Sequence, residues 1–201
     1  MKDTLKFAGS TLLLLVTLIM INMIFVQSLT GDYDWFNVLL ALVFTLVVLA
    51  AALYDGLNRG AKDVKYTRMM ERQMTERGYV MTEKEKERLF KPAKGFVAGF
   101  IAAAPSIVLS VLSMIINTDG TNWVMNMLTR ISLGHFLGLF TYMENLTPWL
   151  YLPLALVYPV VMGVAYTYGP KMWDYQVQQM EKAKREKRRK VNRRRKKKTT
   201  V

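Results

Sequence analysis

The chain has 201 residues, of which 52% are hydrophobic, and it carries 28 Lys and Arg residues against 15 Asp and Glu. It has no cysteine and a single histidine, His135, which excludes disulfide bonds, thiolate metal sites and any site built from several histidines. The apolar residues form blocks that are almost free of charge, an arrangement typical of membrane proteins rather than of soluble domains.

The first apolar block, residues 7–29, contains no charged residue. About 20 apolar residues in a helix cross the hydrocarbon core of a bilayer, so this block predicts a first membrane span. It is longer than the apolar core of a signal peptide and no small-residue cleavage motif follows it, so we expect it to be retained. Its strongest polar groups, Asn22 and Gln27, could join helices by hydrogen bonds or line a narrow path.

Residues 35–54 predict the second span, with Trp35 and Tyr54 as the aromatic residues at its two interfaces. The short acidic connection 30–34 makes the first two spans a helical hairpin. Residues 55–94 are polar, with 11 Lys and Arg against 7 Asp and Glu.

This polar segment predicts two short helices. The first runs to about Arg77 and ends at Gly78, and the second begins at Thr82, which forms a capping box with Glu85. We expect a helical loop that is too short to have a core of its own.

The third span, residues 95–117, has Gly95, Gly99 and Ala103 at intervals of four residues. Small residues at this spacing leave one helix face almost bare, which favours close helix packing in lipid. Pro105 lies in mid-span and predicts a kink.

Residues 122–140 form a segment of mixed polarity with one charge, Arg130, and two glycines. The pattern predicts an amphipathic helix on the outer surface or, alternatively, a re-entrant piece. His135 and Glu144 could form an acid–base pair, but a histidine at the interface near a loop glutamate is the simpler interpretation. No catalytic motif accompanies them, so we expect neither an enzyme nor a cofactor.

The fourth span, residues 148–169, contains Pro153 and Pro159 and is expected to bend. Its exit resembles that of the second span, because Tyr, Gly, Lys and Asp follow one another in both. A duplicated hairpin would give this echo, and so would independent use of these residues at helix ends.

The tail, residues 171–201, holds 14 Lys and Arg residues against only three acidic ones. Met172–Ala183 has helical character, but hydrophobic residues almost vanish beyond it, so the tail cannot pack as a core. Such a tail attracts anionic lipid or the phosphates of RNA. The expected anion-binding residues are Lys187, Arg188, Arg189, Lys190, Arg193, Arg194, Arg195, Lys196, Lys197 and Lys198.

The Lys and Arg residues are concentrated in segments 55–94 and 171–198, whereas connection 30–34 has none and 118–147 has only Arg130. The positive-inside rule therefore places both termini and the central loop in the cytoplasm. The sequence predicts an all-α polytopic membrane protein with four transmembrane helices in two hairpins. Residues 1–170 would form the membrane domain and 171–201 a polybasic cytoplasmic tail.

The whole pattern resembles small four-span membrane proteins of Gram-positive bacteria. The resemblance rests on the Tyr54–Asp63 exit, the "PAKGFVAGFIAAAPSIVLSVL" third span, the proline-containing fourth span with its "YTYG" exit, and the basic end. It implies the bacterial plasma membrane and no biochemical activity. The tail alone is similar to those of YidC-type membrane insertases, which contact ribosomes. Those proteins also have an arginine in a membrane-embedded groove, and none of the four predicted spans contains arginine.

Three functional hypotheses follow. The first is a structural or accessory membrane protein whose tail binds anionic lipid of the cytoplasmic leaflet or a polyanionic partner. The second is a subunit of an oligomeric transporter or channel, formed as a homo-oligomer or within a membrane complex. The third is an accessory protein that contacts a ribosome or RNA through the tail. The tail lacks the interleaved aromatic residues that stack on bases, so we expect no sequence-specific RNA recognition.

Overall fold

The computed structural model describes residues 2–27, 35–117, 120–136, 140 and 147–199. These residues form α-helices and short 3-10 helices and no β-strand. The elements are α1 (Lys2–Gln27), α2 (Trp35–Glu76), α3 (Glu83–Leu89), α4 (Ala93–Ile116), α5 (Trp123–Ser132), η1 (Gly134–Phe136), η2 (Pro148–Leu150), α7 (Tyr151–Thr167) and α8 (Gly169–Thr199).

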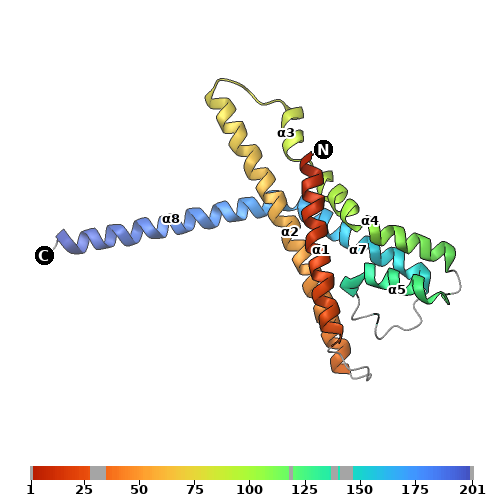
Figure 1. Ribbon diagram of the computed structural model, residues 1–201. Helices are drawn as coiled ribbons and strands as arrows, with labels where there is room; N and C mark the ends of the chain where they lie inside the picture. The colour runs from red at the N-terminus through yellow and green to blue at the C-terminus, as the bar shows by residue number, and fades with distance from the viewer. Residues whose placement is uncertain (1, 28–34, 118–119, 137–139, 141–146, 200–201) are drawn as a thin grey trace.

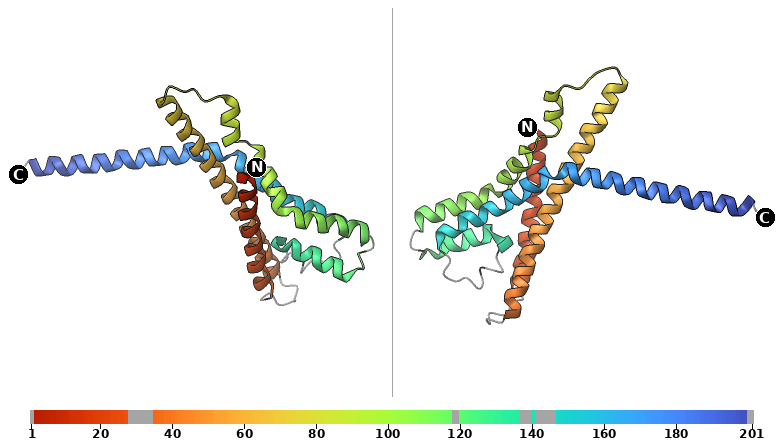
Figure 2. Two further views of the ribbon diagram at one scale, coloured as in Figure 1. Left: turned by 45° about the horizontal axis from the view of Figure 1, so that its top comes forward. Right: turned by 180° about the vertical axis from the view of Figure 1, so that it is seen from behind.

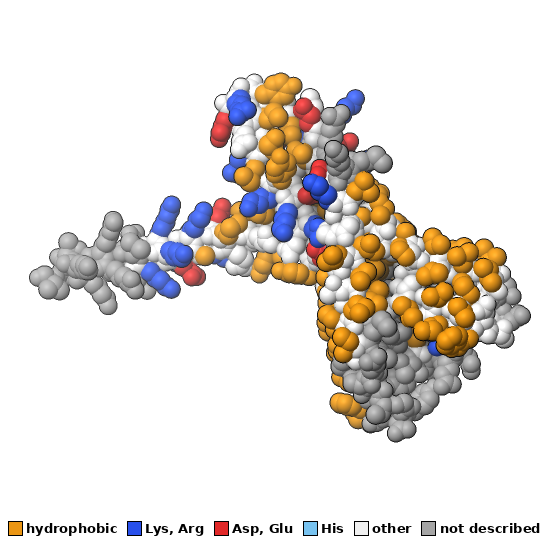
Figure 3. All heavy atoms as spheres, viewed as in Figure 1, with side chains coloured by type: hydrophobic (Ala, Val, Ile, Leu, Met, Phe, Trp, Pro, Cys, Tyr) orange, Lys and Arg blue, Asp and Glu red, His pale blue; other side chains and the backbone are white. Residues whose placement is uncertain are grey.

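Four of these helices, α1, α2, α4 and α7, are long and apolar enough to cross a membrane. The prediction of an all-α, four-span protein is confirmed, and the chain is a polytopic membrane protein. Many large apolar side chains of the spans point outward, as lipid-facing residues do. Figure 3 shows these side chains over α1, α4, α5 and α7, whereas charged side chains gather on the upper part of α2, on α3 and along α8.

The spans pack across the two hairpins. Helix α1 packs mainly on α4, α2 packs mainly on α7, and α4 and α7 share the largest contact, whereas α1 and α2 touch each other little. The views in Figures 1 and 2 show the α4–α7 pair meeting α1 and α2 near the start of α1 and leaning away from them farther along. We call the end of the bundle where α1 and α4 begin and α7 ends the basic end.

Helix α2 does not stop where the predicted second span stops. It continues without a break from Trp35 to Glu76, past Tyr54, so that its second half projects beyond the basic end (Figure 1). Gly78, with a φ of 76°, then ends the helical segment as predicted. The predicted capping box is also present, because the Thr82 amide donates to Glu85 Oε2 at 2.9 Å and α3 begins there.

The close contact between α4 and α7 depends on glycine residues of α4. A methyl group added at Gly99 of α4 would lie 2.9 Å from the Cα atom of Pro159 in α7. Gly95, also in α4, lies directly against the side chain of Tyr166. Ala103, farther along the same face of α4, is buried. These small residues let the two helices approach more closely than larger side chains would allow.

Helix α5 runs beside the half of α4 that is remote from the basic end. The Ser106 hydroxyl, near the middle of α4, donates to the Ser132 carbonyl at 2.7 Å. The hydroxyl of the fully buried Thr129 donates to the Met125 carbonyl of α5 at 2.8 Å and lies 3.5 Å from the Leu109 carbonyl of α4. Since α5 lies alongside a membrane span over this length, the geometry favours the re-entrant alternative for segment 122–140. Residues 137–139 of that segment lie outside the described residues.

The position of α5 beside α4 gives Arg130 a protein environment. Its Nε donates to the hydroxyl of the buried Tyr151 at 3.2 Å, and its guanidinium lies 6.0 Å from the centre of the Phe140 ring. A charged side chain beside a span is tolerated when protein groups take the place of water in this way.

The α4–α7 contact predicts a measurable difference between two glycines. Gly99→Ala places a methyl group against the backbone of Pro159 and should lower the free energy of unfolding by about 1–3 kcal/mol, the usual cost of overpacking. Gly9→Ala in α1 is the control, because nothing lies within 4 Å of the added methyl, and it should be neutral or stabilising by up to about 1 kcal/mol. Thermal unfolding in detergent would measure both; equal effects would contradict the contact.

Candidate functional site: the charged junction at the basic end

Asp63 of α2 joins three helices at the basic end. Its Oδ2 accepts hydrogen bonds from Lys94 Nζ of α4 at 2.6 Å and from the Tyr166 hydroxyl of α7 at 2.6 Å. The side chains of Asp63 and Lys94 are 29% and 16% exposed. This partly buried ion pair fixes α2 relative to the start of α4 and the end of α7, since a charge-assisted bond of this length is among the stronger contacts in proteins.

A second ion pair lies about one turn earlier on the same side of α2. Arg59 Nε donates to both carboxylate oxygens of Asp55, at 2.9 and 2.8 Å. The guanidinium of Arg59 also lies 4.8 Å from the centre of the Phe7 ring, a cation–π contact with α1. Phe7 in turn packs on Tyr166, with 5.7 Å between ring centres, so α1 is joined to the same cluster.

An open cleft of about 1140 Å³ lies beside these pairs. Its walls come from the start of α1, the middle of α2, helix α3 and the start of α4. Six of its lining residues are cationic and four are acidic. The cationic residues are Lys6, Arg59, Lys62, Lys84, Lys91 and Lys94, and the acidic residues are Asp3, Asp55, Asp63 and Glu87.

Helix α3 is held on its side of the cleft by Lys86. Its Nζ lies 2.9 Å from Glu71 Oε1 of α2 and 3.3 Å from Glu83 Oε1 of α3 itself. The hydrogen bonds that Lys86 donates to Glu71 and Glu83 raise the pKa of its ammonium group above the usual value. The raised pKa is consistent with an ion pair that favours the charged form of the lysine.

The tail helix α8 crosses α2 at the same end. A methyl group added at Gly60 of α2 would lie 2.9 Å from the Cα atom of Gly169, so the two backbones are in direct contact. Beyond the crossing, Arg68 Nη1 lies 2.7 Å from Asp174 Oδ1, and Lys65 Nζ lies 5.7 Å from the centre of the Trp173 ring. These contacts give α8 a fixed direction where it leaves the bundle (Figures 1 and 2).

The described side chains of α8 beyond residue 177 are exposed. The helix is continuous from Gly169 to Thr199, so it extends beyond the segment Met172–Ala183 for which the sequence showed helical character. Every residue from 178 to 190 is exposed. The absence of proline and glycine beyond Pro170, together with the good helix propensity of Lys and Arg, accounts for the extension.

The structure places the predicted site residues in different regions. Gly95, Gly99 and Ala103 lie at the contact of α4 with α7. Residues 187–190 of the predicted anion-binding set are exposed on α8, and residues 193–198 lie on the same helix, although their side chains are outside the described residues.

The remaining candidates cannot be placed in a site. Asn22 and Gln27 lie on α1, but their side chains are outside the described part, as is the side chain of His135. Glu144 is also outside the described residues, so the acid–base pair stays a hypothesis. Within the described ranges, no three His, Asp or Glu residues lie close enough together to hold a metal ion.

Sequence reasoning did not find the charged junction. The residues that form it were visible only as part of a loop of mixed charge, 55–94, and as single charges beside the spans. The echo between the exits of α2 and α7 gave one signal, because Gly60 and Gly169 of that echo meet in the structure. The other signal was a pair of opposite charges close to two spans. Lys94 lies at the start of the third span, and Asp63 lies in the helix that continues the second span.

No protein-family model matches the chain, and no curated protein or solved structure is significantly similar to it.

Two of the acidic residues that join α2 to other helices, Asp63 and Asp174, should differ in their contribution to stability. Asp63→Asn leaves the largely buried Lys94 ammonium without its anion and should cost about 1–3 kcal/mol of unfolding free energy. Asp174→Asn removes a pair whose side chains are about half exposed and should cost less than about 1 kcal/mol. Denaturation in detergent would compare them, and a larger loss for Asp174→Asn would contradict the role given to Asp63.

Proposed function

We propose that this chain is an accessory protein of the bacterial plasma membrane, with both termini in the cytoplasm, and that α8 is a basic arm that binds anionic lipid. The observation that carries the proposal is the direction of α8: contacts with α2 orient its base, while its outer part is exposed. A tail without these contacts would be a flexible tether. The proposal gives the chain no catalytic role and no cofactor.

The bacterial membrane and the sidedness rest on the sequence. The resemblance to small four-span proteins of Gram-positive bacteria supports the bacterial plasma membrane. The excess of Lys and Arg on segments 55–94 and 171–198 supports the cytoplasmic side for the basic end. On that side α8 begins where the fourth span ends, close to the anionic headgroups of the inner leaflet.

The distribution of charge around α8 supports a second candidate partner, a polyanion other than the lipid surface. Lys184, Arg185, Lys187, Arg188 and Lys190 follow one another over less than two turns and, at 3.6 residues per turn, point to all sides of the axis. A helix that lies on a membrane has an apolar face toward the lipid, and α8 has none after Ala183. A partner such as ribosomal RNA, which can contact several sides, is therefore the second candidate.

The test uses the full-length protein in nanodiscs of phosphatidylcholine, mixed with vesicles of rising phosphatidylglycerol content. Binding should rise with the anionic fraction and fall with salt. Arg188→Gln with Arg189→Gln should weaken it by about 2 kcal/mol, at about 1 kcal/mol for each cation near the surface. The matched control is Arg72→Gln with Arg77→Gln, which removes one exposed cation from α2 and one from the residue that follows it, and it should have a smaller effect.

Ribosomes added as a competitor separate the two candidates. If they remove the protein from anionic vesicles at physiological salt, the ribosomal partner replaces the lipid surface. Equal binding by both double variants would contradict the role of α8 altogether.

A transporter or channel subunit remains the alternative from a different class. In that case Asn22→Leu or Gln27→Leu should abolish function, whereas the α8 variants should not.

A further inference from the structure

We infer that the cleft at the basic end binds the phosphate group of an anionic phospholipid, whose acyl chains lie along the exposed side of α4 at Val97. This site is separate from α8. It would hold one lipid molecule in a defined position, whereas the arm would contact a surface.

The charges in the cleft leave an excess of cations for a ligand. Asp55 and Asp63 are already engaged by Arg59 and Lys94. Among the described residues, none of the other four lysines that line the cleft makes an ion pair, and two acidic residues, Asp3 and Glu87, accompany them. These four lysines are Lys6, Lys62, Lys84 and Lys91.

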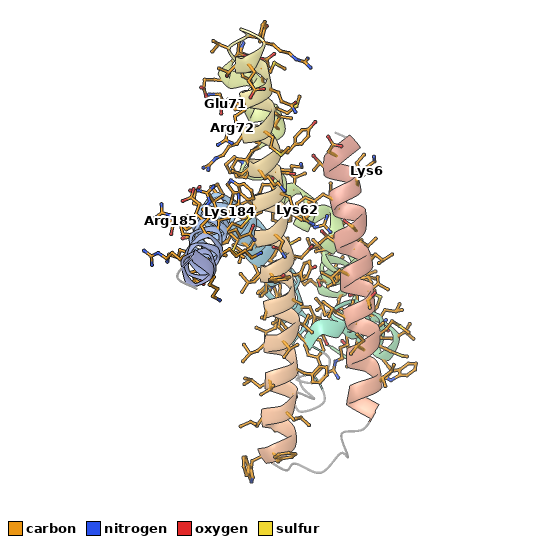
Figure 4. The ribbon with its side chains drawn as sticks, turned by 90° about the vertical axis from the view of Figure 1, so that its left-hand side faces the viewer. Lys6, Lys62, Glu71, Arg72, Lys184 and Arg185 are labelled. Atoms are coloured by element: carbon orange, nitrogen blue, oxygen red, sulfur yellow. The ribbon has the colours of Figure 1, made fainter. Side chains whose placement is uncertain are left out.

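The lysines come from different elements, which gives the cleft a defined shape. Lys6 belongs to α1, Lys62 to α2 and Lys84 to α3, and Lys91 lies in the connection between α3 and α4. Figure 4 shows α1 and α2 side by side, with Lys6 and Lys62 near the same end, while α8 with Lys184 and Arg185 leaves on another side of α2. The Asp63–Lys94 pair and the Lys86 bridge hold three of these elements together, so the cations are positioned before a ligand arrives.

The apolar part of the lining indicates what kind of anion enters. Phe7 of α1, Leu89 of α3 and Val97 of α4 line the cleft together with the charged residues. Val97 is 47% exposed and lies one turn inside the apolar helix α4, on a surface that meets acyl chains. The cleft thus runs from a cationic region down to the lipid-facing side of a span. A molecule with a phosphate at one end and an acyl chain at the other matches both parts.

The size of the cleft agrees with this ligand. Pockets for small molecules have volumes of about 300–1,000 Å³, and the open cleft of about 1140 Å³ is large enough for a headgroup and its glycerol unit. A soluble phosphate would satisfy the lysines alone and would leave the apolar part unused, which is why we assign the phosphate to a lipid.

The experiment measures lipid retained by the full-length protein in detergent by native mass spectrometry. Phosphatidylglycerol is titrated against phosphatidylcholine of the same acyl chains. The wild-type protein should retain one phosphatidylglycerol per chain with preference over phosphatidylcholine. Lys62→Gln with Lys91→Gln should weaken this binding about 30-fold, the effect expected for two cations near a phosphate. Lys184→Gln with Arg185→Gln on α8 is the matched control and should leave this bound lipid unchanged.

A second pair of variants tests the lateral entrance without changing charge. Val97→Trp fills the apolar part of the cleft and should also release the lipid. Val108→Trp, at an exposed position farther along α4, should not. Both variants add the same side chain to the same helix. The melting temperature of each variant shows whether it is folded, so a folded Val97→Trp protein that has lost the lipid would support the lateral entrance.

Three results would overturn the inference. Equal retention of phosphatidylglycerol by the Lys62/Lys91 variant and the α8 variant would exclude the cleft. If the wild-type protein retained phosphatidylcholine as well as it retains phosphatidylglycerol, a preference for an anionic ligand would be excluded. Displacement of the lipid by millimolar glycerol phosphate or inorganic phosphate, with no effect of Val97→Trp, would assign the cleft to a soluble phosphate. The first two results would leave the proposal for α8 standing, because the arm is tested with vesicles and other residues.

Discussion

The close approach of α7 to both α2 and α4 is the contact on which the rest of the structure depends. In a bilayer the hydrophobic effect does not drive apolar helices together, because lipid tails are as apolar as their side chains. Their association therefore depends on close packing and on polar contacts. The approach is possible because glycines stand where the helices meet: Gly99 of α4 lies against Pro159 of α7, and Gly60 of α2 lies against the carbonyl of Tyr166 of α7. Helix α7 is thereby the common partner of the two hairpins, which also meet where α1 packs on α4 and where Asp63 of α2 binds Lys94 of α4.

The charged junction follows from this packing. Once the end of α7 lies against α2, the hydroxyl of Tyr166 reaches Asp63, and the start of α4 brings Lys94 to the same carboxylate. The direction of α8 has the same origin, because the helix begins at Gly169 and its first turns must cross α2. Arg68 and Lys65 then contact its side chains. The cleft and the basic arm α8 thus both depend on the contact of the end of α7 and the start of α8 with α2. They lie on different sides of α2.

Several features could be predicted because each depends on a short stretch of chain. The four spans follow from the length of the apolar blocks, the end of the helical segment from Gly78, and the start of α3 from Thr82 and Glu85. The continuation of α2 past Tyr54 could not be predicted from the apolar pattern, because hydropathy marks where a helix leaves the lipid and not where it ends. The placement of α5 was left open for a related reason. An amphipathic pattern is the same on a membrane surface and against the serine-rich face of α4.

The sequence by itself determined that this chain is a helical membrane protein with a basic C-terminal tail. Composition and the length of the apolar blocks are local properties, and they decide directly which segments partition into lipid and which stay in water. Only the tertiary structure decided which charges share a site. Asp63, Lys94 and Tyr166 lie up to 103 positions apart, and no local pattern relates them. Their meeting depends on which helix faces adjoin, and in lipid that choice is made by the few positions where the absence of a side chain lets two backbones touch.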